Sequence, residues 1–194
     1  MTAARRIVFI DPSITDWKTL LAGLSADIEV VILNQATDGL LQIADSLRGA
    51  SGVSAIHIFS HGSSGELLLG DTVVNAGNLQ QYSAALATIG NALIASGDIL
   101  LYGCNVAQGE VGLQFIERLG QITGADVAAS TDLTGGLAVG DWVLEASIGD
   151  IGAVALFLDG SLASYSYPLG IDDYAGNIGT TTHPVLTALD FMVI

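Results

Sequence analysis

Two stretches, IHIFSHG at Ile56–Gly62 and DILLYGCN at Asp98–Asn105, decide the fold that we predict for this chain. Each is a short apolar run that ends beside a reactive residue, His61 in the first and Cys104 in the second. Continuous apolar runs of this length indicate strands buried on both faces of a parallel sheet. All strands of such a sheet end at one edge, where ligands of open α/β sheets bind. If the two strands are neighbours, as a single right-handed crossover favours, His61 and Cys104 come within reach of each other.

Strand and helix patterns alternate around these stretches up to about residue 125. The predicted strands span residues 6–11, 28–33, 53–60, 98–102 and 126–129. The predicted helices span residues 17–24, preceded by a capping box at Ser13–Asp16, and then run from Thr37 to Gly49, from Asn78 to Leu93, and from Gly109 to Ile122. This alternation predicts an α/β fold, a three-layer sandwich around a mainly parallel sheet.

Two regions depart from that alternation. Apolar pieces on either side of Gly70-Asp71, Leu67–Leu69 and Thr72–Val74, predict a small β-hairpin. Beyond Ser130, residues 142–145 and 151–158 are typical of strands without helices between them, which predicts a C-terminal β extension. Residues 168–194 are turn-rich and aperiodic, so we divide the chain into a domain at 1–167 and a linker or start of a following module at 168–194.

The composition excludes several functions. Twenty acidic residues against five basic ones give a net charge of −15 in 194 residues, which opposes binding to nucleic acid or to anionic lipid. No apolar run approaches the roughly 20 residues of a membrane-spanning helix, so no membrane insertion is expected. No signal peptide is visible at the start of the chain. The acidic, lysine-poor composition favours a secreted or cell-surface setting, with a cytoplasmic one as the alternative.

Cys104 is the only cysteine, which excludes an intramolecular disulfide and a thiolate cluster for a metal. A lone cysteine is often a small buried apolar residue. Here, however, its predicted position beside His61 favours a nucleophile, because histidine can take the thiol proton. Gly62 and Gly103 let backbone N–H groups approach a ligand closely, as an oxyanion hole requires. We predict no metal site and no cofactor, since no histidine–carboxylate group has ligand spacing and the glycine-rich stretches lack a phosphate-loop lysine.

Three other residues are weaker candidates for a role in the site. His57 is four residues before His61 and is interpreted as a packed or capping histidine. Asp11 ends the first strand at the same sheet edge, where it can either cap the following helix or orient His61. His183 falls in the predicted linker and is expected at the surface.

Strands that end in His-Gly and in a small residue followed by Cys resemble those of the caspase, gingipain and legumain clan of cysteine peptidases. The resemblance runs from about Ile7 to Trp142. In more detail, the chain resembles an uncharacterised family of caspase-like domains near the N-terminus of large bacterial surface or secreted proteins. The phrases SHGSSGELLLG, LLYGCNVAQGEVG and ASTDLTGG carry that likeness.

The resemblance implies roles for particular residues. Cys104 would be the nucleophile and His61 the general base or acid. The backbone N–H groups of Gly62 and Cys104 would form the oxyanion hole. Residues 130–132 would line the pocket for the residue before the cut: Ser130, Thr131 and Asp132.

Two functions follow from these expectations. The first is a cysteine endopeptidase acting on a peptide or protein substrate, including a large surface or secreted parent protein with further domains. No lysine or arginine follows Arg118, so an enzyme specific for basic residues could not release its own tail. The second is a non-catalytic caspase-like module for export, retention or assembly of a bacterial surface protein. An ordinary nucleotide-binding domain is disfavoured, because no glycine-rich turn follows the first strand.

Overall fold

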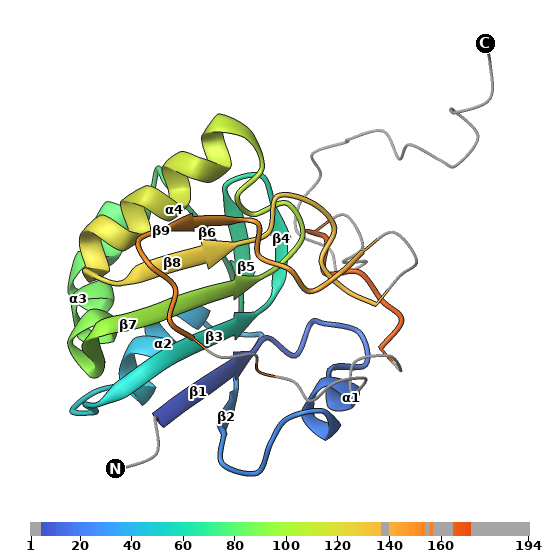
Figure 1. Cartoon of the computed structure of the whole chain (residues 1–194), viewed down its shortest axis with the longest axis horizontal. Coiled ribbons are helices and arrows are strands. Elements are labelled where there is room, and N and C mark those ends of the chain that lie inside the picture. Colours follow the sequence, from blue (N-terminus) through green and yellow to red (C-terminus); the bar gives the residue numbers. More distant parts are fainter. Residues whose placement is uncertain (1–4, 137–139, 154–155, 157–164, 172–194) are drawn as a thin grey trace.

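A six-stranded sheet forms the centre of the computed structural model, which describes residues 5–136, 140–153, 156 and 165–171. Its strands are β1 (Arg5–Ile10), β2 (Glu29–Ile32), β3 (Val53–Phe59), β7 (Leu93–Tyr102), β8 (Asp126–Ala129) and β9 (Ala146–Ile148). They lie in the order β2-β1-β3-β7-β8-β9, and all neighbours are parallel except β8 and β9 (Figure 1). The predicted α/β fold, mainly parallel with a C-terminal β extension, is confirmed.

Helices cover both faces of the sheet. The helices are α1 (Trp17–Ala22), α2 (Gly39–Ser46), α3 (Ser83–Ala92) and α4 (Gly109–Thr123), and a 3-10 turn, η1, spans Leu79–Tyr82. Side chains alternate along β1, so Phe9 belongs to the apolar core with Ile43 of α2, whereas Ile10 belongs to the opposite core with Leu20 of α1. Among the described residues, none of the helices has the length and apolar character needed to cross a bilayer.

The predicted hairpin is present and belongs to a second, smaller sheet. It consists of β4 (His61–Ser63), β5 (Glu66–Leu69) and β6 (Thr72–Asn75), which pair antiparallel in that order. The chain therefore leaves the central sheet after β3 and turns into β4 at His61. That turn places His61 at the carboxyl edge of the large sheet.

Some predicted boundaries differ from the structure. Helix α1 begins at Trp17 without a capping box. Its N-cap residue, Asp16, has a left-handed backbone (φ 54), and the Asp16 carboxylate accepts a hydrogen bond from the Thr19 hydroxyl. The helix predicted to reach Leu93 ends one residue earlier, and β7 begins there with an irregular register against β3.

The C-terminal β extension also differs in position. Residues 142–145 form no strand, and β9 begins only at Ala146. The Trp142 ring packs at a tilt against the Phe59 ring, with centroids 6.1 Å apart. Residues 151–153 are not a strand, and most of the predicted strand 151–158 lies outside the described residues, as do His183 and residues 172–194.

His57 is a buried residue of the sheet, as the interpretation of a packed histidine requires. Its side chain is fully buried on β3, between the register partners Val8 and Leu100. Neither ring nitrogen has a hydrogen-bond partner within the part of the chain that the structure describes. Burial, with a smaller contribution from the positive charge of Arg6, lowers the pKa of His57 from 6.5 to about 4.

This burial predicts a pH-dependent stability. Below pH 6.5 the unfolded chain protonates His57 while the folded chain does not, so the free energy of unfolding should fall until the pH reaches about 4. The full loss is about 3 kcal/mol. His57→Leu should remove this component of the slope, as measured by urea unfolding of both proteins across that pH range. An unchanged slope in His57→Leu would contradict a neutral buried histidine.

Candidate functional site

The site lies where β3 and β7 end side by side. Phe59 of β3 is in register with Tyr102 of β7, and the N–H of Ser60 donates to the Tyr102 carbonyl at 3.1 Å. His61 and Cys104 each follow two residues later, at the same level of the sheet. The His61 side chain is 2% exposed and Cys104 is 0% exposed. The structure therefore contains the neighbouring strands that the sequence predicts. These strands bring both residues to the same buried region at the carboxyl edge of the sheet.

A backbone carbonyl orients His61. Its Nε2 atom lies 3.3 Å from the carbonyl oxygen of Ser13, in the loop after β1. Because a carbonyl can only accept, Nε2 is the donor in this contact, and Nδ1 is the ring nitrogen left to exchange a proton with another group. Sequence reasoning missed Ser13, because a backbone acceptor leaves no signature in the residue type.

Asp11 holds the loop that carries this carbonyl. Its side chain is fully buried, and its two carboxylate oxygens accept from the N–H of Ser13 at 2.9 Å and from the N–H of Gly70 at 2.6 Å. Asp11 thus ties the end of β1 to the β5–β6 turn. It contributes to the position of His61 through the Ser13 loop, and it is not the cap of α1, where Asp16 stands.

Thr134, which the sequence did not single out, contacts the loop of Cys104 twice. The Cys104 thiol donates to the Thr134 carbonyl at 3.3 Å, and the Thr134 hydroxyl donates to the Gly103 carbonyl at 3.1 Å. Thr134 is fully buried. It therefore holds the cysteine loop against the segment that follows β8.

The backbone N–H groups of Gly62 and Cys104 point to one atom. They donate to the carbonyl oxygen of Leu169 at 2.8 and 3.0 Å. Two N–H donors that converge on one oxygen form the geometry of an oxyanion hole. A side chain at residue 62 would abolish it, because a Cβ there would lie 2.6 Å from the Val106 methyl group and 3.0 Å from the Cys104 carbonyl oxygen.

Leu169 belongs to a segment, Tyr165–Ile171, that crosses the carboxyl edge of the sheet (Figure 1). The N–H of Leu169 donates to the Thr134 carbonyl at 3.0 Å, and Gly136 donates to the Tyr167 carbonyl at 3.4 Å. Pro168 forms an antiparallel bridge with Gly135. The segment Tyr165–Ile171 therefore lies as an added strand along residues 134–136.

Aromatic packing anchors the start of this segment. The Tyr165 ring is fully buried and meets the Trp142 ring edge to face, with centroids 5.5 Å apart. Trp142 in turn contacts Phe59, which stacks on Tyr102 at 4.4 Å. Burial, followed by the negative charge of Asp16, raises the pKa of the Tyr165 phenol well above its usual range. The added strand thus shares a core with the ends of β3 and β7.

The residues predicted to line a substrate pocket have local partners. Ser130 is buried and its hydroxyl contacts both the carbonyl and the carboxylate of Asp132 at 3.2 Å. The N–H of Thr131 donates to the Glu145 carboxylate at 2.8 Å. The Asp132 side chain is exposed, while its carbonyl accepts from the N–H of Asn105, directly after Cys104, at 2.7 Å. These residues support the cysteine loop, and their role as a pocket stays a prediction.

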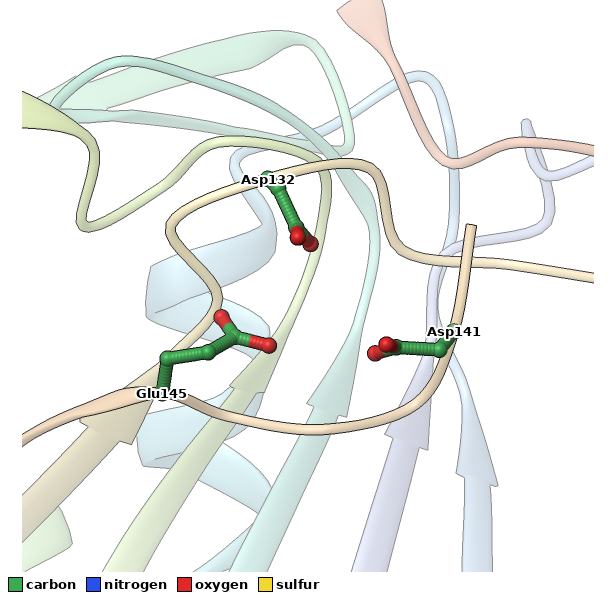
Figure 2. Close-up of side chains that lie close together, drawn as sticks. All are labelled: Asp132, Asp141 and Glu145. Carbon is green, nitrogen blue, oxygen red and sulfur yellow. The ribbon is translucent and has the colours of Figure 1, made fainter. Parts of the chain in front are cut away.

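Three carboxylates form the one group in the described residues whose geometry could hold a metal ion. Asp132, Asp141 and Glu145 are exposed, and their oxygens lie within 4.8 Å of one another. Figure 2 shows them pointing into a common space from the loop between β8 and β9. Oxygen ligands of this kind suit a hard cation such as Ca²⁺. Exposed acidic groups are also common without one, so this cluster alone assigns no cation.

Comparisons with known proteins give a family but no activity. No curated protein matches the chain. A match among solved structures is the crystal structure of caspase-1 from Spodoptera frugiperda, with 16% sequence identity and a TM-score of 0.33. That match covers 56% of this chain, and the chain spans half of the caspase chain. A family model covers residues 7–169, from β1 to the leucine whose carbonyl lies between Gly62 and Cys104, and the chain belongs to that family, described as a domain of unknown function, DUF4347.

Proposed function

We propose that this chain is a cysteine endopeptidase in which Cys104 is the nucleophile and His61 is the general base and then the general acid. The observation that supports it best is the convergence of the Gly62 and Cys104 N–H groups on one carbonyl oxygen. A structural cysteine needs no such arrangement, whereas acyl transfer to a thiol requires it. One donor of this kind is worth about 3 kcal/mol of transition-state stabilisation.

The proposed roles are divided among the groups around His61 and Cys104. His61 takes the thiol proton at Nδ1 while the Ser13 carbonyl holds its Nε2–H and, during the reaction, stabilises the imidazolium. The Gly62 and Cys104 N–H groups bind the oxygen that becomes negative. The thiol now donates to the Thr134 carbonyl, so the sulfur must leave that contact before it attacks.

The backbone of residues 134–136 supplies the site for the substrate. Thr134 offers a carbonyl and Gly136 an N–H to an extended chain, and both are in use by the segment Tyr165–Ile171. Main-chain pairing of this kind recognises an extended peptide irrespective of most of its side chains. The substrate class we propose is therefore an extended stretch of a protein, such as a large surface or secreted parent protein.

Covalent labelling tests this proposal. Because the segment Tyr165–Ile171 covers the thiol in wild type, the test uses Tyr165→Ala, which removes the buried anchor of that segment, with circular dichroism to check the fold. In this variant a peptidyl acyloxymethyl ketone should modify Cys104 at a rate well above that of free cysteine, because the site both activates the thiol and binds the carbonyl of the probe. Adding His61→Ala should slow this labelling about a hundredfold or more, since proton transfer by a positioned histidine contributes that much. Intact mass and peptide mapping measure the modification.

His57→Leu is the matched control for His61→Ala, because it replaces a buried histidine of the preceding strand that lies outside the site. Added to Tyr165→Ala, it should leave the labelling rate unchanged. If Cys104 of Tyr165→Ala reacts no faster than free cysteine and adding His61→Ala changes nothing, the endopeptidase proposal is wrong. The chain would then be the non-catalytic module.

A glycine substitution should uncover the thiol without changing His61 or Cys104. A Cβ at residue 136 would lie 1.4 Å from the Tyr165 carbonyl oxygen, so Gly136→Ala must displace the segment Tyr165–Ile171. We expect iodoacetamide to modify Cys104 about tenfold faster or more in Gly136→Ala, because the buried thiol becomes accessible.

Gly152→Ala is the control for this substitution, because no atom lies closer than 4.0 Å to a Cβ at that exposed position. It should react like wild type. Circular dichroism reports whether both variants keep the fold. Equal reaction rates in wild type, Gly136→Ala and Gly152→Ala would contradict the cover that the segment provides.

A further inference from the structure

The segment Tyr165–Ile171 lies in the position of a bound substrate. Its Leu169 carbonyl accepts from Gly62 and Cys104, the two donors that would hold a carbonyl under attack. Its Leu169 N–H donates to the Thr134 carbonyl at 3.0 Å, the same oxygen that accepts the Cys104 thiol at 3.3 Å. The reactive sulfur and the Leu169 backbone therefore share one acceptor atom, which places the thiol next to this residue.

The two residues that flank the Leu169–Gly170 bond have different surroundings. The Leu169 side chain is fully buried in the core that also contains Ile14, Cys104 and Tyr165. Gly170, on the other side, has no side chain and forms a parallel bridge with Gly62. The site thus holds an apolar side chain before the bond, and a residue without a side chain after it.

Ordinary packing of a C-terminal segment explains the buried Tyr165 and Leu169 side chains, but not the backbone. A packed segment needs only apolar contacts, and its carbonyl could accept from any donor. Instead, the carbonyl lies between both donors of the proposed oxyanion hole, and the residues before it pair with 134–136 as an added strand. Gly135 and Gly136 make that pairing possible, since a Cβ at either would lie 2.3 Å or less from a carbonyl oxygen of the segment.

We propose that the protein cuts its own chain between Leu169 and Gly170, and that its pocket selects leucine before the cut. This inference rests on the proposed function. It also resolves the constraint set by the absence of lysine and arginine after Arg118, because a leucine-directed enzyme needs no basic residue to release its own tail.

The reaction balances with the groups present and one water. The Cys104 sulfur bonds to the Leu169 carbonyl carbon while His61 takes the thiol proton. The bond to the Gly170 nitrogen breaks, and His61 returns the proton to that nitrogen, which leaves as a free amine. Water, deprotonated by His61, then attacks the thioester, releasing the Leu169 carboxylate and restoring the thiol.

The first experiment follows the full chain over time by intact mass spectrometry and N-terminal sequencing. We expect conversion to a fragment that ends at Leu169 and a peptide that begins at Gly170. The Cys104→Ala variant should stay intact. The rate constant should not change on about tenfold dilution, because the substrate is part of the same molecule. Parallel samples with calcium and with EDTA test whether cleavage needs a cation held by Asp132, Asp141 and Glu145.

The second experiment tests leucine selection on added peptides. The Tyr165→Ala variant, whose segment has lost its buried aromatic anchor while the edge at residues 134–136 is unchanged, receives the peptide YSYPLGIDDY, the sequence of residues 165–174, or the same peptide carrying L169K. We expect cleavage after leucine in the first peptide. The cleavage rate of the second peptide should be lower by about a hundredfold or more, because burying the lysine ammonium in an apolar site costs free energy. Tyr165→Ala combined with Cys104→Ala is the blank.

The outcomes separate the two proposals. An intact wild-type chain, together with a Tyr165→Ala variant that labels at Cys104 but cuts elsewhere or cuts both peptides equally, overturns the Leu169–Gly170 cut and leaves the endopeptidase proposal standing. An intact wild-type chain, together with a Tyr165→Ala variant whose Cys104 reacts no faster than free cysteine, overturns both. Cleavage at another bond in wild type overturns the cut site alone.

Discussion

The register between β3 and β7 is the constraint on which the rest of the site depends. Phe59 and Tyr102 are paired in that register, so the chains that leave the two strands reach the same level at His61 and Cys104. A shift by one residue would turn every side chain of one strand to the opposite face and separate the pair. The two apolar cores on either side of the sheet fix this register, because each strand buries alternate side chains in each core.

The chemistry proposed for the site is built mainly from backbone groups. The Ser13 carbonyl faces the imidazole, the Gly62 N–H helps to hold the Leu169 carbonyl, and the Thr134 carbonyl accepts from the thiol. Backbone dipoles fixed by strands and turns need no reorganisation when charge develops, which is the condition for strong electrostatic stabilisation. At Gly62 this backbone geometry needs a residue without a side chain, because a Cβ there would collide with Val106.

The sequence predicted the sheet and the positions of His61 and Cys104 because apolar strands with reactive residues at their ends leave a direct signature. It did not predict the partners of the pair. Thr134 acts on the thiol through its carbonyl, and Leu169 lies far along the chain in a stretch without periodicity. Any residue type has a carbonyl, so such contacts become visible only in three dimensions. The strand predicted at residues 142–145 is absent, and the packing of Trp142 against Phe59 is another tertiary contact that the local sequence does not show.

A peptide that is part of the chain competes with every other substrate for the residue 134–136 edge. A tethered segment of this kind has an effective concentration on the order of millimolar, so a peptide supplied at micromolar concentration would occupy the edge in only a small fraction of molecules. After a cut at Leu169 the new carboxylate would stay between the same two N–H donors, held by the buried Tyr165. The architecture therefore suits an enzyme that acts once on itself, and screens for turnover on added peptides would record it as inert.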